Sequence, residues 1–364
     1  MIIELDKFDV QKFWEENDYC LQNFDKKTRI PIFYWLDDHF LFEFLNVEST
    51  VKYYNDYEYR LRLHKEANEK LEKVLGRKFY PEDPVEPPSP NRFEVLMGAK
   101  YVLTEGGTPW LMSQVEDVED LKELIRNMEK IDMKKSALPE DFMEKKEKYE
   151  RITGKKLKLG NFSRGPATMA TSILGTENTC IFMMEEEDIL LEFFEILCQK
   201  LIEYNKVLRK ATDNNEFGYS FADDNCFLFP PKKYLKFCAP FLEKIFKEFA
   251  PLKEHKRYQH SDSNMKHLMS ILNDLGVNEV NFGPEIHPEE IRKAMPKAKI
   301  YGQMPPFTLR NGKPEDIIEI VKRDMKFLGE DGNFVECTAG SVAGGTPLEN
   351  IKLYMWAVEK YCRL

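Results

Sequence analysis

Three side chains that can bind a metal ion come at the ends of two apolar runs in the last third of the chain. His260 and Asp262 close one run, and Cys337 closes a much later one. A neutral imidazole nitrogen, a carboxylate oxygen and a thiolate sulfur all bind zinc, and three protein ligands with an open fourth position are typical of catalytic zinc sites. Residues two apart on a strand share one face, so His260 and Asp262 can point into one site. The pattern predicts a zinc centre made by His260, Asp262 and Cys337.

Each of these residues also has a structural interpretation. His260 can be a hydrogen-bonded structural histidine, and Cys337 can be a small buried hydrophobic residue, a common fate of free cysteine. Asp262 can cap the helix that follows it. The polar neighbours of His260 leave its structural and metal-binding roles equally open, whereas the Gly-rich loop after Cys337 favours a functional role for that residue.

Two further polar residues are candidate catalytic groups. Asp223 and Asp224 follow a predicted strand, and neighbouring strand residues point to opposite sides, so at most one of them faces the site. We expect Asp224 to be that residue. Gln303 ends another predicted strand, where it can hydrogen-bond a substrate. Hydrogen bonding within loops explains Asp224 and Gln303 equally well.

Alternating strands and helices can bring these residues together. Apolar runs alternate with helix-like segments, which is typical of parallel β/α units, and such folds place their chemistry at the carboxyl ends of the strands. The predicted strands are residues 29–36, 100–104, 156–162, 217–222, the run that closes at 258–262, 277–285, 298–304 and 333–340. The predicted helices are residues 47–76, 115–130, 188–210, 234–249, 264–275, 287–295 and 314–329.

This order predicts an α/β protein: a single (β/α)8 TIM-type barrel over residues 1–364, with residues 1–90 forming an N-terminal helical region packed on the barrel. A doubly wound open sheet is the alternative, but it usually has a Gly-rich first turn, and the sequence contains no GxGxxG. The Pro-rich residues 81–90 predict an extended surface connection and not a boundary between independent domains.

Composition limits the classes of partner. The net charge of −10 argues against a nucleic-acid partner and against an anionic membrane surface. The 42% hydrophobic content supports a folded core. No apolar run approaches the roughly 18 residues of a membrane span. The seven cysteines form no CxxC motif, and the N-terminus lacks the pattern of a signal peptide. We expect a cytoplasmic protein with reduced thiols.

Several segments, in one order along the chain, resemble the uroporphyrinogen decarboxylase superfamily over most of residues 29–360. The segments are Arg29 to Ile32, Gly165 to Gly175, His260 to Asp262, Gly302 to Met304 and Gly345 to Asn350. True decarboxylases of this superfamily bind a polycarboxylate substrate through N-terminal arginines and a Gln-Ala-Gly-Arg segment. Here the corresponding region lacks that motif and carries Asp37 and Asp38, so the decarboxylase activity is not expected.

The resemblance is closer to the zinc-dependent methyltransferases of corrinoid pathways. These enzymes carry a His-x-Cys pair after one strand and a distant Cys after the last. His260 and Cys337 match that pattern, and Asp262 stands where the second Cys would be. The resemblance implies bound zinc and transfer of a methyl group between a small methylated substrate (a methoxylated aromatic, a methylamine or a thiol) and a corrinoid.

The corrinoid (cobalamin) is expected on a separate partner protein, because the sequence has no Asp-x-His-x-x-Gly motif. Two other functions stay open: a metal-free lyase of the decarboxylase type, and a non-catalytic binding member of the family, which the Asp262 replacement keeps open. A homodimer is also known in the superfamily. The N-terminal aromatic residues either line the substrate pocket or belong to the core, and the core is favoured; they are Phe33, Tyr34, Trp35 and Phe40.

Overall fold

A computed structural model describes residues 5–364, so residues 1–4 of the predicted N-terminal helical region lie outside the described residues. Contacts within the chain define two compact units. Unit 1 contains the chain up to Glu82, together with residues 105–108 and 279–364, and unit 2 contains residues 83–104 and 109–278. The chain first passes from unit 1 to unit 2 between Glu82 and Asp83, within the predicted Pro-rich connection.

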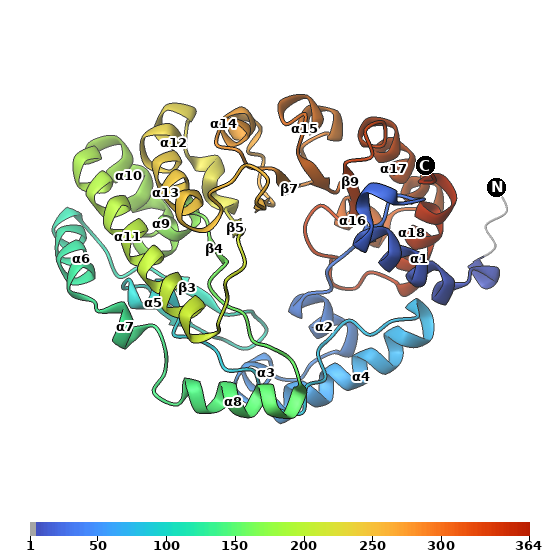
Figure 1. Cartoon of the computed structure of the whole chain (residues 1–364), viewed down its shortest axis with the longest axis horizontal. Coiled ribbons are helices and arrows are strands. Elements are labelled where there is room, and N and C mark those ends of the chain that lie inside the picture. Colours follow the sequence, from blue (N-terminus) through green and yellow to red (C-terminus); the bar gives the residue numbers. More distant parts are fainter. Residues whose placement is uncertain (1–4) are drawn as a thin grey trace. The chain divides into compact units, whose positions relative to one another are not determined.

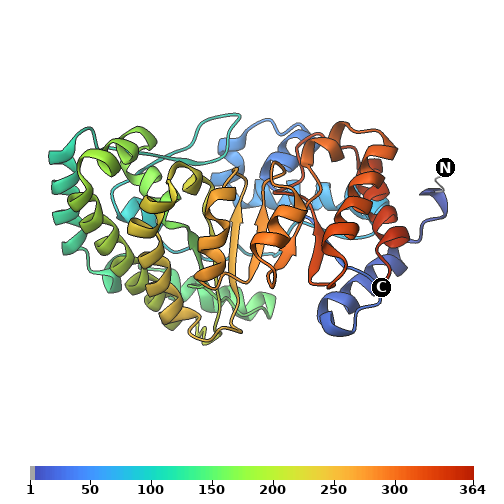
Figure 2. The ribbon, with the colours of Figure 1, turned by 90° about the horizontal axis from the view of Figure 1, so that it is seen from above.

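The described part of unit 1 holds four parallel strands in the order β1-β9-β8-β7. These strands are β1 (Ile32–Phe33), β7 (Glu279–Phe282), β8 (Lys299–Tyr301) and β9 (Phe334–Cys337). The helices of unit 1, labelled in Figure 1, are α1 (Val10–Gln22), α2 (Asp38–Leu45), α3 (Thr50–Asn55), α4 (Tyr57–Leu75), α15 (Pro288–Ala294), α16 (Pro306–Asn311), α17 (Pro314–Leu328) and α18 (Leu348–Tyr361). Strands and helices alternate in the orange-to-red part of the chain in Figure 2.

Helix α17 shows how unit 1 builds its core. The helix begins at Pro314, where the missing backbone N–H costs nothing in the first turn. Ile317, Ile318 and Val321 follow at helical spacing and are buried. Helix α17 packs against α18 and β9, and the Tyr354 hydroxyl of α18 donates to Glu336 Oε1 of β9 at 2.8 Å.

The described part of unit 2 holds three parallel strands in the order β4-β5-β6. They are β4 (Phe162–Arg164), β5 (Tyr219–Ala222) and β6 (Arg257–Ser261). The helices of unit 2 are α5 (Phe93–Leu96), α6 (Val118–Lys130), α7 (Met133–Ser136), α8 (Phe142–Thr153), α9 (Pro166–Leu174), α10 (Thr176–Glu185), α11 (Glu187–Ala211), α12 (Pro231–Phe237), α13 (Ala239–Phe249) and α14 (Met269–Asp274).

One face of the unit 2 strands is covered by helices. Tyr219 and Phe221 of β5 are buried, with ring centroids 5.5 Å from Phe249 and 6.1 Å from Phe246 of α13, respectively. Helix α11 packs on α13. The opposite face of β5 carries Ser220 and Ala222, which are only partly buried. Side chains on that second face are therefore available for a site.

Residues 100–104, predicted as a strand of the barrel, belong instead to an antiparallel pair. Strand β2 (Lys100–Val102) pairs with β3 (Trp110–Met112), and Tyr101 lies opposite Leu111. The short apolar run identified a strand but carried no information on the direction of its partner. The parallel strands described in the two units therefore do not include it.

The predicted α/β class is confirmed, and several boundaries differ from the prediction. The predicted helix 47–76 is divided because the Asp56 side chain accepts the Tyr59 N–H at 3.0 Å and caps a new helix, α4. The predicted helix 234–249 is interrupted near Cys238, where α13 starts again with a proline in its first turn. The predicted strand 156–162 lies later, at Phe162–Arg164.

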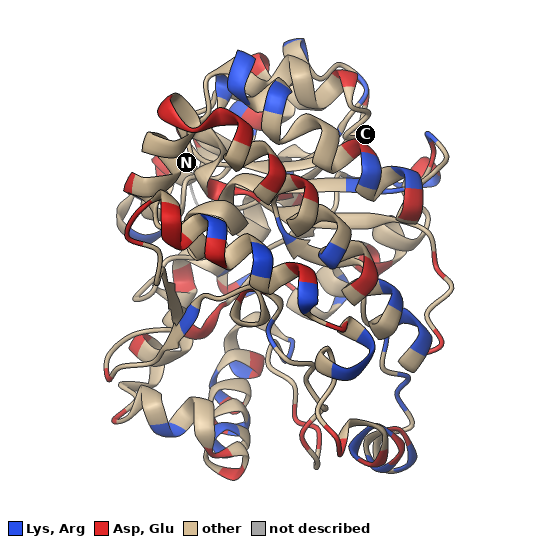
Figure 3. Cartoon of the chain, turned by 90° about the vertical axis from the view of Figure 1, so that its left-hand side faces the viewer, with Lys and Arg blue, Asp and Glu red and all other residues tan. Residues whose placement is uncertain are grey.

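Among residues 5–364, no helix is both long and apolar enough to cross a membrane. Figure 3 shows Lys and Arg interspersed with Asp and Glu along the helices on the side in view. Such mixing is typical of solvated helix faces.

Candidate functional site

Strand β6 places His260 on the open face of the unit 2 sheet. Gln259 and Ser261 are fully buried, whereas the His260 side chain between them is 24% exposed. The register aligns His260 with Ala222 of β5, and Ala222 with Arg164 of β4. Side chains alternate along a strand, so His260 lies on the face that the α13 helix does not cover.

Two carboxylates lie beside His260 at the carboxyl ends of β5 and β6. Its Nε2 atom lies 3.4 Å from Asp262 Oδ1 and 4.0 Å from Asp224 Oδ1. One ligand atom from each of the three residues lies within 4.8 Å of the others. The Asp262 backbone N–H donates to Asp224 Oδ1 at 2.7 Å, which ties the two strand ends together. We refer to Asp224, His260 and Asp262 as the cluster.

The spacing of the cluster fits a divalent cation. Two ligands that are each about 2.1 Å from a tetrahedral ion lie roughly 3.4 Å apart. The separation of 3.4 Å between His260 and Asp262 matches this value, and the 4.0 Å to Asp224 needs a small adjustment. One imidazole and two carboxylates suit several divalent metals, so this donor set does not by itself select zinc.

Asp223, the residue before Asp224, holds this segment of the chain against the start of α9. Its buried Oδ1 accepts the Thr168 N–H at 2.7 Å, in the first turn of α9. An added Cβ at Gly165 would lie 2.3 Å from Asp223 Cβ, so only glycine lets this helix start pack so closely. Burial raises the pKa of Asp223 to about 7. Asp223 therefore points away from the cluster and anchors the segment that presents Asp224.

Cys337, the third predicted ligand, belongs to unit 1, where it ends β9. Its thiol is 5% exposed, and burial, together with the Glu336 carboxyl, raises its pKa. A neutral thiol is a poor ligand, and a metal ion that binds it displaces the proton. The structure brings His260 and Asp262 together with Asp224, whereas the participation of Cys337 stays a prediction.

Gln303 is held by hydrogen bonds to other residues of unit 1. It is buried, its N–H donates to Asp324 Oδ2 at 2.7 Å, and its side-chain Nε2 donates to the Ile286 carbonyl at 3.2 Å. The Oε1 atom has no hydrogen-bond partner among the described residues. That oxygen can accept a hydrogen bond, but its contact with a substrate stays a prediction.

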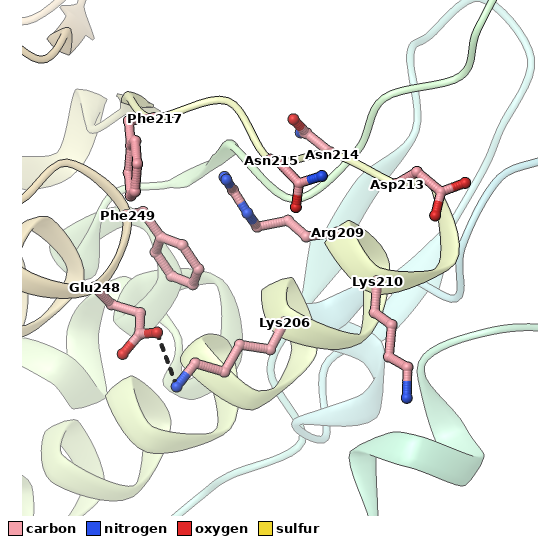
Figure 4. A pocket seen from close by; sticks show the side chains of 9 residues that line it. All are labelled: Lys206, Arg209, Lys210, Asp213, Asn214, Asn215, Phe217, Glu248 and Phe249. Atoms are coloured by element: carbon pink, nitrogen blue, oxygen red, sulfur yellow. Dashed lines mark ion pairs between the residues drawn. The ribbon is translucent and has the colours of Figure 1, made fainter.

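A polar pocket of about 460 Å³ lies elsewhere in unit 2, at the C-terminal end of α11. Figure 4 shows Lys206 paired with Glu248, at 2.9 Å, and Lys210 pointing away from Arg209. Its residues come just before β5 or β6 in the chain, so the pocket lies toward the amino ends of these two strands. In parallel β/α folds the chemistry sits at the other end, and the cluster is therefore the better candidate.

Asp224 was predicted from the sequence as a catalytic group and not as a metal ligand. The available signal was the Asp-Asp pair after a strand, but the sequence did not show that β5 and β6 are neighbours. The role of Asp223 as the anchor of α9 was not predicted. The Gly-Pro at residues 165–166, which begins that helix, was the only sequence signal near this contact.

Comparison with known proteins gives a family and a fold. A family model described as "Uroporphyrinogen decarboxylase (URO-D)" matches residues 94–361, which confirms the resemblance found in the sequence. A solved structure, a methyltransferase from Methanosarcina mazei, is similar with a TM-score of 0.63 and 16% sequence identity. The match covers 98% of this chain and 99% of that chain. No curated protein is significantly similar in sequence. At this identity the structural match shows a shared fold.

Proposed function

Because this chain belongs to the uroporphyrinogen decarboxylase family, we propose that it is a cytoplasmic methyltransferase acting with a separate corrinoid protein. It moves a methyl group between the corrinoid (cobalamin) and a small methylated substrate: a methoxylated aromatic, a methylamine or a thiol. The observation that carries the proposal is the cluster of Asp224, His260 and Asp262 at the strand ends. The fold shared with a methyltransferase supports it.

We assign His260, Asp262 and Cys337 as the residues that hold zinc. Zinc held by these residues would supply Lewis acidity to the substrate heteroatom. The methyl carbon then leaves with the electron pair of the old bond remaining on that heteroatom, and the acceptor provides the pair for the new bond. A carboxylate at Asp262 donates less electron density to the metal than a thiolate would, so the metal is the stronger Lewis acid. A stronger Lewis acid favours a weakly basic heteroatom such as an ether oxygen.

Asp224 and Gln303 are proposed to act on the substrate directly. The Asp224 carboxylate is 46% exposed and lies beside His260, so it can take up or return the proton of a hydroxyl or thiol group. The unpaired Oε1 of Gln303 is proposed to accept a hydrogen bond from the substrate. Both roles require only side chains that are already oriented by backbone hydrogen bonds.

We further propose that residues 1–364 form one closed (β/α)8 barrel domain, with residues 1–90 packed on it. The corrinoid protein would dock over the carboxyl ends of the strands, where the cluster lies. The proposal includes a homodimer and does not include nucleic acid or a membrane as partners, since the net charge is −10.

The test is a methyl-transfer assay with purified protein, a reduced corrinoid and each substrate class in turn. The proposal predicts methylation of the corrinoid, followed by its absorbance, which His260→Ala abolishes. A metal-free lyase would instead release carbon dioxide from a carboxylated substrate, and a non-catalytic relative would bind the corrinoid protein without turnover. Either result in place of methyl transfer would refute the proposal.

A further inference from the structure

Two large aromatic side chains of unit 1 are exposed at the carboxyl end of β1. The chain alternates regularly there: Ile32, Tyr34 and Leu36 are buried, at 1%, 5% and 4% exposure, while Phe33 is 50% and Trp35 is 65% exposed. The interpretation of this segment as core is therefore correct for Tyr34 and wrong for Phe33 and Trp35. Alternation places Phe33 and Trp35 on one face of an extended segment.

This face adjoins the end of β9, because β1 pairs with β9 in parallel, and α2 follows it in the chain. Phe33 is aligned with Cys337 in the parallel register. The segment continues along the loop after β9, where the Val342 N–H donates to the Trp35 carbonyl at 2.9 Å. Adjacent strands are about 4.8 Å apart, so a ring on Phe33 lies beside the predicted cysteine ligand.

The two chain segments that form and adjoin this face contain no positively charged residue. Residues 30–51 and 333–350 contain no Lys or Arg, whereas Asp37 and Asp38 follow Trp35 directly. Arg310, from another segment, lies next to Gly345, where the Glu43 carboxylate also lies. These segments therefore offer an anionic substrate no positively charged partner.

The spacing of the two rings suits a flat ligand. Residues two apart on an extended chain are about 6.6–6.8 Å apart. That separation is close to twice the roughly 3.5 Å contact distance between carbon atoms. One planar ring can therefore touch both Phe33 and Trp35, whereas a small aliphatic thiol or amine would leave most of their exposed surface in water.

We propose that Phe33 and Trp35 bind the ring of a neutral aryl methyl ether, which makes this compound class the methyl donor. The inference rests on the proposed function. Of the three substrate classes, the ether alone combines a planar ring, no charge and a free lone pair on the heteroatom. A methylammonium ion has no lone pair until it loses its proton.

The test measures binding to the purified full-length chain without corrinoid, so it does not depend on methyl transfer. The probe is 1,2-dimethoxybenzene, compared with cyclohexyl methyl ether, 3-methoxybenzoate and tetramethylammonium by calorimetry or ligand-observed NMR. We expect 1,2-dimethoxybenzene to bind most tightly. Trp35→Ala and Phe33→Ala should each weaken it by roughly tenfold, whereas Trp35→Phe should keep most of the affinity.

Trp110→Ala is the matched control, because Trp110 is 49% exposed in β3 of unit 2. Equal binding of cyclohexyl methyl ether, or tighter binding of tetramethylammonium or methoxybenzoate, would overturn the inference. So would a Trp35→Ala variant that binds the arene normally but binds the corrinoid protein poorly. If the arene binds as expected but no substrate is demethylated, the proposed function fails while the aromatic site stands.

Discussion

The backbone N–H of Asp262 donates to Oδ1 of Asp224 at 2.7 Å. This bond joins the residue just after β6 to the one that opens the 3-10 helix after β5, residues Asp224–Leu228. It also brings the Asp224 carboxylate beside His260. A carboxylate fixed in this way needs little reorganisation to act on a substrate or an ion.

Asp262→Cys is expected to retain zinc or bind it more tightly, because thiolate is a softer ligand than carboxylate. Asp262→Ala removes the donor atom and should weaken zinc binding by at least tenfold. Competition titration against a chromophoric chelator measures both. If Asp262→Cys lost its zinc, Asp262 would not be a ligand.

Asp224→Asn should lower the methyl-transfer rate by roughly 100-fold, because the amide cannot take up a proton. The amide oxygen can still accept the Asp262 N–H, so the melting temperature should change little. Steady-state rates and bound metal are measured together. Asp213→Asn is the control, since Asp213 is exposed and its positive φ of 48° suits Asn. Loss of metal in Asp224→Asn would make Asp224 a ligand and contradict its catalytic assignment.

Asp223→Ala should destabilise unit 2, whereas Asp223→Asn should be much milder. Alanine leaves the partly buried Thr168 N–H without its acceptor, which costs about 1–3 kcal/mol. Asparagine retains an oxygen at the same position. Urea unfolding measures the difference, and similar midpoints for the two variants would show that the bond to α9 contributes little.

Glu187 should make a pH-dependent contribution to stability. Hydrogen bonds from Lys233 and Lys236 lower the pKa of Glu187 to about 2, from an ordinary value of 4.5. Because the folded-state pKa is depressed, the stabilisation is present above about pH 4.5 and is lost as the pH falls toward 2. Glu187→Gln should therefore lower the melting temperature at pH 7 and have no effect near pH 2.

Glu192→Gln on the same helix is the control for this prediction, because Glu192 is exposed. An effect of Glu187→Gln that is equal at both pH values would show that the two lysines do not act through its charge.

Individual site residues at the ends of strands could be predicted from the sequence, but which of these strands are neighbours could not. Cys337 ends an apolar run that does form β9, and His260 lies within β6, where Tyr258 is the one apolar residue. The pairing of β5 with β6 decides that Asp224 joins His260, and no local pattern encodes which strands are neighbours. Residues 100–104 show the same limit, since their run gave a strand with an antiparallel partner.

The exposure of Phe33 and Trp35 also could not be predicted from the sequence. Their alternation with Ile32, Tyr34 and Leu36 joins five apolar residues in one run, and such a run is typical of a strand buried on both faces. Only the structure shows that one face is open.

The central claim is tested most directly by the metal content of the purified, untagged protein, measured by elemental mass spectrometry after dialysis. The proposal predicts about one zinc per chain, lost in His260→Ala and in Cys337→Ala, with the far-ultraviolet circular dichroism of both variants unchanged. No bound metal after zinc addition, or full zinc in His260→Ala, would contradict it.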